Sequence, residues 1–404
     1  MRILITSDSY PPEVGSAAQL MAELAQELAE RGHGVTVLTN LPGYKLDAAT
    51  DAARYTEDMT EGKVRVLRVK TLPLHNSGFI MRGFAQLMAP YQYWRVLKRH
   101  EPAPFDAVIV YTPPLPLFWI GTWAKKQRAR FLLNVQDLFP QNAIDLGVLN
   151  NPLAIALFRW IERRAYRSAD VITAHSPMNR RMLIEQNPDI EPKVLVLHNW
   201  IEESQFHADT SVENFRDIWG LNGKFIAVYG GVLGPAQGLD IILDVAEQVR
   251  DLTDLGFLIV GEGMEKERLQ AEATARGLAN VVFKPFVARE RYPALLHAAD
   301  VGFLTLSPKM KTPVVPGKIL GYMAMRLPVL AIVNKESDAH VIVRDAQCGY
   351  SCNSDDVLAA EALVRRLHAE RTKLAEIGER GRAYARAHFD KKITVDQFEA
   401  LLEG

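Results

Sequence analysis

The sequence predicts an α/β protein built from two doubly wound parallel sheets. Short apolar runs that suit buried strands alternate with helical patterns along nearly the whole chain, which is typical of sheets covered by helices on both faces. The alternation occurs twice, with a break near residues 198–208, and 404 residues suffice for two domains that each bury a core. Ligands of such sheets bind beyond the carboxyl ends of the strands, so functional residues are expected in the loops that follow strands.

In the first half, strands are predicted at residues 3–6, 35–39, 107–111, 131–135, 171–174 and 194–197. The first helix is expected at 17–31, because Leu20, Leu24 and Leu28 share a spacing of four and Gly32 ends the pattern. In the second half, strands are predicted at 225–229, 257–260, 281–283, 301–306 and 328–332. A short helix is expected from Pro316, a long helical run over 357–389 and a last helix at 393–402.

Composition narrows the function classes. A net charge of -1 implies no bulk attraction to nucleic acid, so we expect no nucleic-acid partner. Cys348 and Cys352 have no nearby histidine or second cysteine pair to complete a zinc site. The chain starts directly with a strand and has no apolar run of about 18 residues, the length of a spanning helix. We therefore expect no signal peptide and a cytoplasmic location.

The helix expected at Pro316 opens with Gly317 and Lys318, and it suggests an anion site. Unpaired N–H groups and the positive end of the helix dipole favour a negative group, such as a nucleotide phosphate. The alternative is an ordinary solvated lysine at a helix start.

The loop after the first strand, residues 7–16, ends in Gly15 before a serine that we expect to cap the first helix. A glycine there allows a substrate to approach the backbone closely. The loop lacks the G-x-G-x-x-G pattern, which argues against a dinucleotide site. The alternative is a plain connection between a strand and a helix.

Several motifs resemble those of one enzyme family. Tyr-Pro-Pro-Glu-x-Gly at 10–15 precedes Leu-Ala-x-Glu-Leu-Ala-x-Arg-Gly-His-x-Val-Thr-Val-Leu-Thr at 24–39, and His-Asn-Trp-Ile stands at 198–201. A glycine-rich loop at 229–239, Val-Gly-Glu-Gly at 260–263 and Ala-Ala-Asp-Val at 298–301 follow in order. Together they resemble the retaining glycosyltransferases of family 4. Within that family, the loop at 229–239 and Asp-Leu-Phe-Pro at 137–140 are similar to enzymes of bacterial surface polysaccharides, including transferases of N-acetylfucosamine type.

The resemblance implies a GT-B fold, in which two Rossmann-like domains face each other across a cleft. It implies an acceptor domain at 1–198, a donor domain at 199–390 and a C-terminal helix at 391–404 that packs back on the first domain. It also implies that no metal or other cofactor is needed. The donor, a nucleotide-diphosphate sugar, is expected to contact the following residues: Gly15, Gly231, Gln237, Glu262, Gly317, Lys318 and Gly321. A diphosphate leaving group must be stabilised by fixed donors and positive charge, which glycine backbones and Lys318 would supply.

The chain departs from the family pattern at the donor residues. Where many relatives hold the phosphates with an arginine and a lysine, this chain has Val232 and Gln237. Two glutamates that lie eight positions apart in many relatives are also replaced here, by Pro313 and by Gly321. In those relatives the second glutamate binds the donor ribose. The loss of that carboxylate removes an interaction of about 1.5–3 kcal/mol. Three side chains are candidates to replace these groups: Glu262, Lys309 and Lys311.

On the acceptor side, Gln136 and Asp137 follow the strand predicted at 131–135. A carboxylate there can orient or deprotonate a hydroxyl nucleophile, and a turn or N-cap role is the alternative for Asp137. Gln136 stands where many relatives have a histidine. His175 follows another strand, and its alternative is a structural role.

Residues 79–130 combine aromatic side chains with eight basic and two acidic residues. This composition suits the headgroup layer of an anionic membrane, at the inner face of the cell membrane. Core aromatics beside solvated basic residues are the alternative.

The sequence therefore predicts a retaining glycosyltransferase that moves a hexosyl or N-acetylhexosaminyl group to a lipid-linked or oligosaccharide acceptor in bacterial surface polysaccharide biosynthesis. The alternatives are a nucleotide-sugar epimerase or hydrolase, and a non-catalytic GT-B partner subunit, which the missing glutamates favour.

Overall fold

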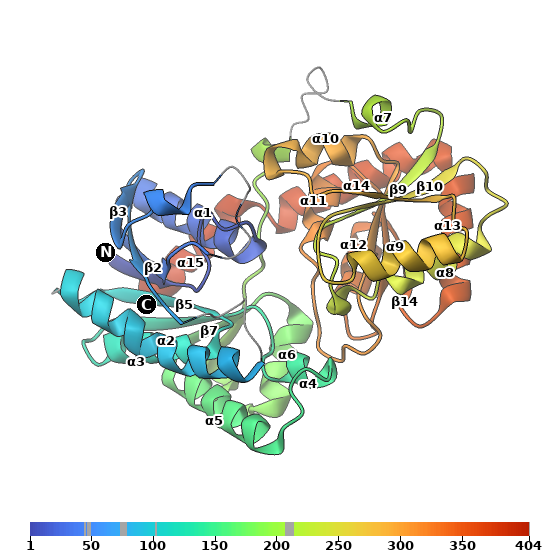
Figure 1. Cartoon of the computed structure of the whole chain (residues 1–404). Coiled ribbons are helices and arrows are strands. Elements are labelled where there is room, and N and C mark those ends of the chain that lie inside the picture. Colours follow the sequence, from blue (N-terminus) through green and yellow to red (C-terminus); the bar gives the residue numbers. More distant parts are fainter. Residues whose placement is uncertain (44–45, 47–49, 73–78, 102, 207–213, 404) are drawn as a thin grey trace. The chain divides into compact units, whose positions relative to one another are not determined.

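The computed structural model describes every residue except 44–45, 47–49, 73–78, 102, 207–213 and 404 (Figure 1). The chain divides into two compact units. Unit 1 comprises Met1–Ile144, Leu149–Asn199 and Lys392–Gly404, and unit 2 comprises Asp145–Val148 and Trp200–Lys391.

Unit 1 contains an eight-stranded sheet in its described residues. Its strands are β1 (Arg2–Thr6), β2 (Gly34–Asn40), β3 (Asp58–Glu61), β4 (Val64–Val69), β5 (Ala107–Thr112), β6 (Arg130–Val135), β7 (Val171–Ala174) and β8 (Val194–Val196). They are ordered β3-β4-β2-β1-β5-β6-β7-β8, and all pairs are parallel except β3 with β4. The sequence patterns did not predict β3 and β4.

Helices cover both faces of this sheet. They are α1 (Ser16–Glu30), α2 (Phe79–His100), α3 (Phe118–Lys125), α4 (Gln141–Asp145), α5 (Pro152–Ser168), α6 (Pro177–Gln186) and α15 (Lys391–Glu403). Side chains of α2, α3, α5 and α6 join one hydrophobic core with β5 and β6. The C-terminal α15 lies against the end of α1, where Arg31 pairs with Asp396 at 2.7 Å and Glu399 at 2.8 Å (Figure 1). The expected cap at Ser16 was wrong, because Gly15 is the N-cap of α1 and no side chain caps it.

Unit 2 contains a six-stranded sheet in its described part, and all of its pairs are parallel. Its strands are β9 (Phe225–Gly230), β10 (Leu255–Val260), β11 (Val281–Lys284), β12 (Val301–Thr305), β13 (Val329–Val333) and β14 (Gly349–Asn353), in the order β11-β10-β9-β12-β13-β14. The sequence patterns did not predict the edge strand β14. The loops that leave β9, β10, β12 and β13 emerge at the same edge of the sheet, because parallel strands end together.

The helices of unit 2 are α7 (Phe215–Ile218), α8 (Asp240–Gln248), α9 (Lys266–Ala275), α10 (Tyr292–His297), α11 (Lys318–Ala324), α12 (Ala339–Ala346), α13 (Val357–Ala369) and α14 (Leu374–His388). Residues of α8, α9 and α13 share one hydrophobic core, and residues of α10, α11, α12 and α14 share another. The helical run expected at 357–389 is therefore two helices, separated by a 3-10 turn at Arg371–Lys373. None of the described helices is both long and apolar enough to cross a membrane.

Candidate functional site

Two glycine-containing loops lie side by side at the carboxyl edge of the unit 2 sheet. Gly231 N–H donates to the Val260 carbonyl at 2.9 Å, and Leu233 N–H donates to the Glu262 carbonyl at 2.9 Å. Glu265 N–H returns a bond of 3.1 Å to the Leu233 carbonyl. The backbone after β9 is thus fixed to the backbone after β10.

This close approach requires glycine. Gly261 has a φ of +154°, and a Cβ there would lie 1.8 Å from the Gly231 carbonyl oxygen. Gly263 has a φ of +156°, and its Cβ would lie 2.2 Å from the Leu233 oxygen. Both side-chain additions would force the two loops apart.

Lys318, at the start of α11, lies over the loop after β9. Its Nζ donates to Gln237 Oε1 at 3.1 Å and lies 4.7 Å from the centroid of the Tyr229 ring. A Cβ on Gly231 would come within 2.5 Å of Lys318 Cε, so glycine at 231 makes room for the lysine. Tyr229 in turn donates to Gln237 Oε1 at 3.1 Å and to the Val232 carbonyl at 2.9 Å.

The Lys318 ammonium lacks a negative partner in the described part of unit 2. Its contacts are a neutral amide and an aromatic face, and no carboxylate of the described residues lies within 4.0 Å of Nζ. Desolvation lowers the pKa of Lys318 to about 8. A half-buried cation without a counter-ion is suited to bind an anion, which would restore the lost solvation.

Aromatic rings lie against Gly321, the position at which many relatives have the glutamate that binds the donor ribose. A Cβ on Gly321 would lie 3.3 Å from Phe206 Cε1 and 3.6 Å from Tyr292 Cε1. Phe206 ends a 3-10 turn at Glu203–Phe206, and Gly321 is itself buried. A longer side chain at 321 would therefore need Phe206 to move.

The other predicted donor residues lie on exposed parts of these loops. Gly317 is the N-cap of α11 and is exposed. Glu262 is exposed and pairs with Lys266 at 2.6 Å. Lys309 and Lys311 are exposed on the loop after β12. Their roles toward a ligand stay predictions.

Gln136, at the end of β6 in unit 1, is buried within an amide cluster. Its Nε2 donates to Asn134 Oδ1 at 2.7 Å and to Asn199 Oδ1 at 2.9 Å. Its Oε1 accepts from Asn199 Nδ2 at 2.7 Å. These bonds connect the end of β6 to the segment after β8, and a catalytic role for Gln136 stays a prediction.

Asp137 follows directly and is exposed, unlike its neighbours Gln136 and Leu138. Displacement of water by the surrounding protein still raises the pKa of its carboxyl above the ordinary value. A carboxylate with these properties can accept a proton from a bound hydroxyl.

His175 lies after β7 and is 6% exposed. Its Nε2 lies 3.4 Å from Asn179 Nδ2, and its carbonyl accepts from His198 Nδ1 at 3.0 Å. Burial, followed by the nearby His198, lowers the pKa of His175 to about 4. Its imidazole is therefore neutral near pH 7.

Gly15 has a φ of 171°, which any residue adopts, and nothing lies within 4 Å of a Cβ built on it. The fold thus leaves space beside this backbone. That space suits the expected approach of a ligand, which stays a prediction.

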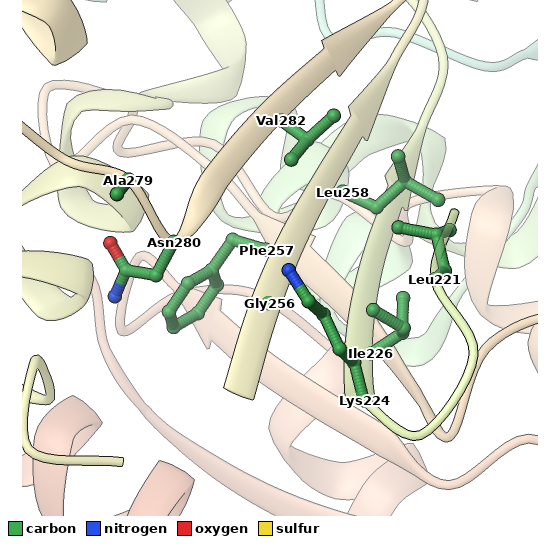
Figure 2. A pocket seen from close by; sticks show the side chains of 9 residues that line it. All are labelled: Leu221, Lys224, Ile226, Gly256, Phe257, Leu258, Ala279, Asn280 and Val282. Carbon is green, nitrogen blue, oxygen red and sulfur yellow. The ribbon is translucent and has the colours of Figure 1, made fainter. Parts of the chain in front are cut away.

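A separate shallow depression lies at the opposite edge of the unit 2 sheet (Figure 2). Residues at the starts of β9, β10 and β11 line it, with Lys224 as its single charged side chain. It lies away from the loops described above. The described residues contain no group of three side chains suited to hold a metal ion.

Sequence reasoning missed several residues that shape these loops. Tyr229 was noted only as part of a motif, although it holds both Gln237 and Lys318. The rings of Phe206 and Tyr292 over Gly321 come from segments distant in sequence, and no local pattern marks them. An aromatic directly before two glycines was the available signal for Tyr229.

Two family models match most of the chain. The model described as "Glycosyl transferase 4-like domain" matches residues 15–200, and "Glycosyl transferases group 1" matches residues 211–384.

Curated relatives and solved structures are similar over most of their length. The putative colanic acid biosynthesis glycosyl transferase WcaI of Escherichia coli K12 is 29% identical over 80% of this chain and 81% of its own. The O-antigen chain mannosyltransferase C of Escherichia coli is 24% identical over 70% of this chain and 67% of its own. The solved structure of Anabaena HepE in complex with UDP has a TM-score of 0.72 at 19% identity and covers 100% of both chains. At that identity the likeness shows a shared fold.

The buried His175 predicts a pH-dependent stability. Its pKa is lower in the folded state than in the unfolded state, so the unfolded chain binds more protons between about pH 4 and 6.5, and stability falls as pH falls through that window. We expect the free energy of unfolding to be about 2.5 kcal/mol lower at pH 4.5 than at pH 7 because of this histidine. Urea unfolding of the wild type and of His175→Gln at both pH values measures it. An equal loss in both proteins would contradict the assignment.

The rings against Gly321 predict that a carboxylate is poorly accommodated there. Gly321→Glu should lower the free energy of unfolding by about 1–3 kcal/mol, from crowding and from burial of the charged group. The matched control is Gly83→Glu in α2, where nothing lies within 4 Å of the added Cβ. In urea unfolding, Phe206→Ala combined with Gly321→Glu should cost less than the sum of the single changes. Strict additivity would show that Phe206 does not limit the space.

Proposed function

We propose that this chain, which belongs to the family 4 glycosyltransferases of the GT-B fold, transfers a sugar from a nucleotide-diphosphate donor to a hydroxyl of a lipid-linked or oligosaccharide acceptor. The relatives named for colanic acid biosynthesis and for an O-antigen chain support a role in bacterial surface polysaccharide biosynthesis. HepE, whose solved structures hold UDP and UDP-glucose, supports a nucleotide-sugar donor. Transfer of a hexosyl or N-acetylhexosaminyl group is part of the proposal.

The observation that carries the proposal is the Lys318 ammonium. It is held by Gln237 and Tyr229 beside the Gly231 backbone, and no carboxylate of the described residues neutralises it. A diphosphate gains negative charge as the glycosidic bond breaks, so a fixed ammonium stabilises the transition state more than the bound donor. We propose that Lys318 supplies this charge, and that the reaction needs no metal.

Gln237 has a different role from a basic residue at that position. It accepts a hydrogen bond from Lys318, and it therefore positions the charge instead of carrying one. We propose that the single ammonium of Lys318 replaces the charge that many relatives place in the glycine-rich loop.

On the acceptor side, we propose that Asp137 orients the hydroxyl nucleophile, because it is an exposed carboxylate in a loop after a strand. His175 is neutral and buried, so it fits positioning better than proton donation. The resemblance supports retention of anomeric configuration, with attack on the face that the leaving group departs from and a donor phosphate oxygen taking the proton. A cytoplasmic location and contact of residues 79–130 with the inner face of the membrane complete the proposal.

The Lys318 role predicts pH-dependent binding of nucleoside diphosphate. The protonated form of Lys318 attracts the anion, whereas its neutral amine does not. The affinity for nucleoside diphosphate should therefore fall as pH rises above about 8. Lys318→Met should weaken binding about 10–100-fold at pH 7.5 and remove this pH dependence, because it deletes a charge-assisted hydrogen bond. Calorimetry with UDP and GDP from pH 7 to 9.5 measures both effects. The matched control, Lys224→Met at the opposite edge of the sheet, should leave affinity unchanged.

The reaction itself is tested with a panel of nucleotide sugars and a bacterial membrane extract. We expect release of nucleoside diphosphate only when donor and acceptor are both present, and loss of that release in Lys318→Met. Release that does not depend on the extract would favour an epimerase or hydrolase. Binding of UDP without turnover on any pair, together with capture of a second transferase, would favour a non-catalytic partner subunit.

A further inference from the structure

The helix α11 has little stability of its own. It has seven residues, no side chain caps its start, and every residue after Lys318 is buried. A helix this short forms only when contacts with the rest of the protein hold it. The position of Lys318, its first residue, therefore depends on what fixes α11 to the unit 2 sheet.

Tyr322 joins α11 to the centre of that sheet. Its side chain is fully buried, and its hydroxyl donates to the Phe303 carbonyl of β12 at 3.1 Å and lies 3.5 Å from the Val228 carbonyl of β9. Its ring lies against Gly302, where an added Cβ would come within 2.5 Å of Tyr322 Cδ2. A buried hydroxyl that loses its acceptor costs about 1–3 kcal/mol, so α11 keeps the rotation that satisfies this bond.

Tyr292, at the start of α10, extends this contact to the end of β9. Its hydroxyl shares a hydrogen bond with the Tyr322 hydroxyl. The same hydroxyl would lie 3.2 Å from a Cβ built on Gly230, and the ring edge would lie 3.6 Å from one built on Gly321. The two tyrosines thus connect α10, α11, β9 and β12 at the residue that precedes Gly231.

We propose that Tyr322, with Tyr292, fixes the rotation of α11 and thereby holds the Lys318 ammonium over the Gly231 backbone. Lys318 and Tyr322 are four residues apart, so they lie on the same face of the helix and turn together. Lys318 has little room to compensate for a rotation, because a Cβ on Gly231 would lie 2.5 Å from its Cε. Without the Tyr322 hydroxyl, the helix turns and the ammonium leaves its amide and aromatic partners.

Tyr322 is a positioning residue, because it is fully buried and acts through Lys318. A packing role without effect on the lysine is the alternative. An effect of Tyr322 on nucleotide binding rests on the proposed function, whereas its effect on the place of the ammonium does not.

The ammonium is measured without a ligand, by the pH dependence of trace acetylation of Lys318, read by mass spectrometry. Lys318 is partly exposed, so the reagent reaches it. Its pKa, lowered to about 8 by desolvation, should appear as the midpoint of this reactivity in the wild type. Tyr322→Phe should move the midpoint above about pH 9, because a displaced lysine regains water. Tyr292→Phe, at a partly exposed residue, should move it in the same direction by less.

Calorimetry with UDP follows the consequence for binding. Tyr322→Phe should weaken UDP binding about fivefold at pH 7.5, because the charge-assisted hydrogen bond is misplaced. In a Lys318→Met background it should cause no further loss, since changes that act through one group are not additive. The matched control, Tyr350→Phe on β14, removes a hydroxyl that donates to Glu370 at 2.6 Å and should change neither the reactivity profile nor the affinity.

The outcomes separate the positioning role from packing and from the proposed function. An unchanged reactivity profile in Tyr322→Phe and Tyr292→Phe, with a loss of unfolding free energy alone, would assign Tyr322 to packing and overturn the inference. Further loss of UDP affinity in the double variant with Lys318→Met would also overturn it. A shifted profile, found while the wild type binds neither UDP nor GDP, would support the positioning role and contradict the proposed function.

Discussion

The interaction on which the unit 2 site depends is the placement of one ammonium over a glycine backbone. Lys318 reaches its position only because Gly231 has no side chain, and it stays there because Gln237 and Tyr229 hold it. The loop after β9 is in turn fixed to the loop after β10 by hydrogen bonds that require Gly261 and Gly263. Glycine spacing, backbone pairing and charge position are therefore parts of one arrangement, and a change in any of them moves the lysine.

The sequence predicts the strands well where they are continuous apolar runs. Strands such as β9 and β10 appear as continuous apolar runs, and their predicted bounds agree closely with the structure. The edge strands β3 and β14 were missed, because they are partly exposed and carry polar side chains such as Asp58 and Ser351. The interior strand β4 was also missed, because Arg65 and Arg68 interrupt its apolar run. The two helices at 357–388 looked continuous, since the turn between them contains no glycine or proline.

The site was predicted only as far as local motifs reach. Gly231 and Gln237 belong to one motif, the glycine-rich loop, and Lys318 belongs to another; the structure brings these three residues together. Gln136 was predicted as a catalytic residue because it follows a strand, but its side-chain amide is hydrogen-bonded to Asn134 and Asn199. Asn199 lies 63 residues further along the chain. The rings that fill the space at Gly321 likewise come from distant segments. Contacts of this kind depend on the tertiary fold, which residue spacing does not encode.

The membrane contact proposed for residues 79–130, where α2 exposes Phe84 and Tyr91 beside Arg95 and Lys98, has a kinetic consequence. A protein held on a bilayer searches for a lipid-linked substrate by lateral diffusion in two dimensions, so its rate follows the surface density of that lipid and not its bulk concentration. A soluble donor still arrives from the aqueous phase. Turnover of such an enzyme would then respond separately to the two substrates, with total lipid acting as a diluent of one and not of the other.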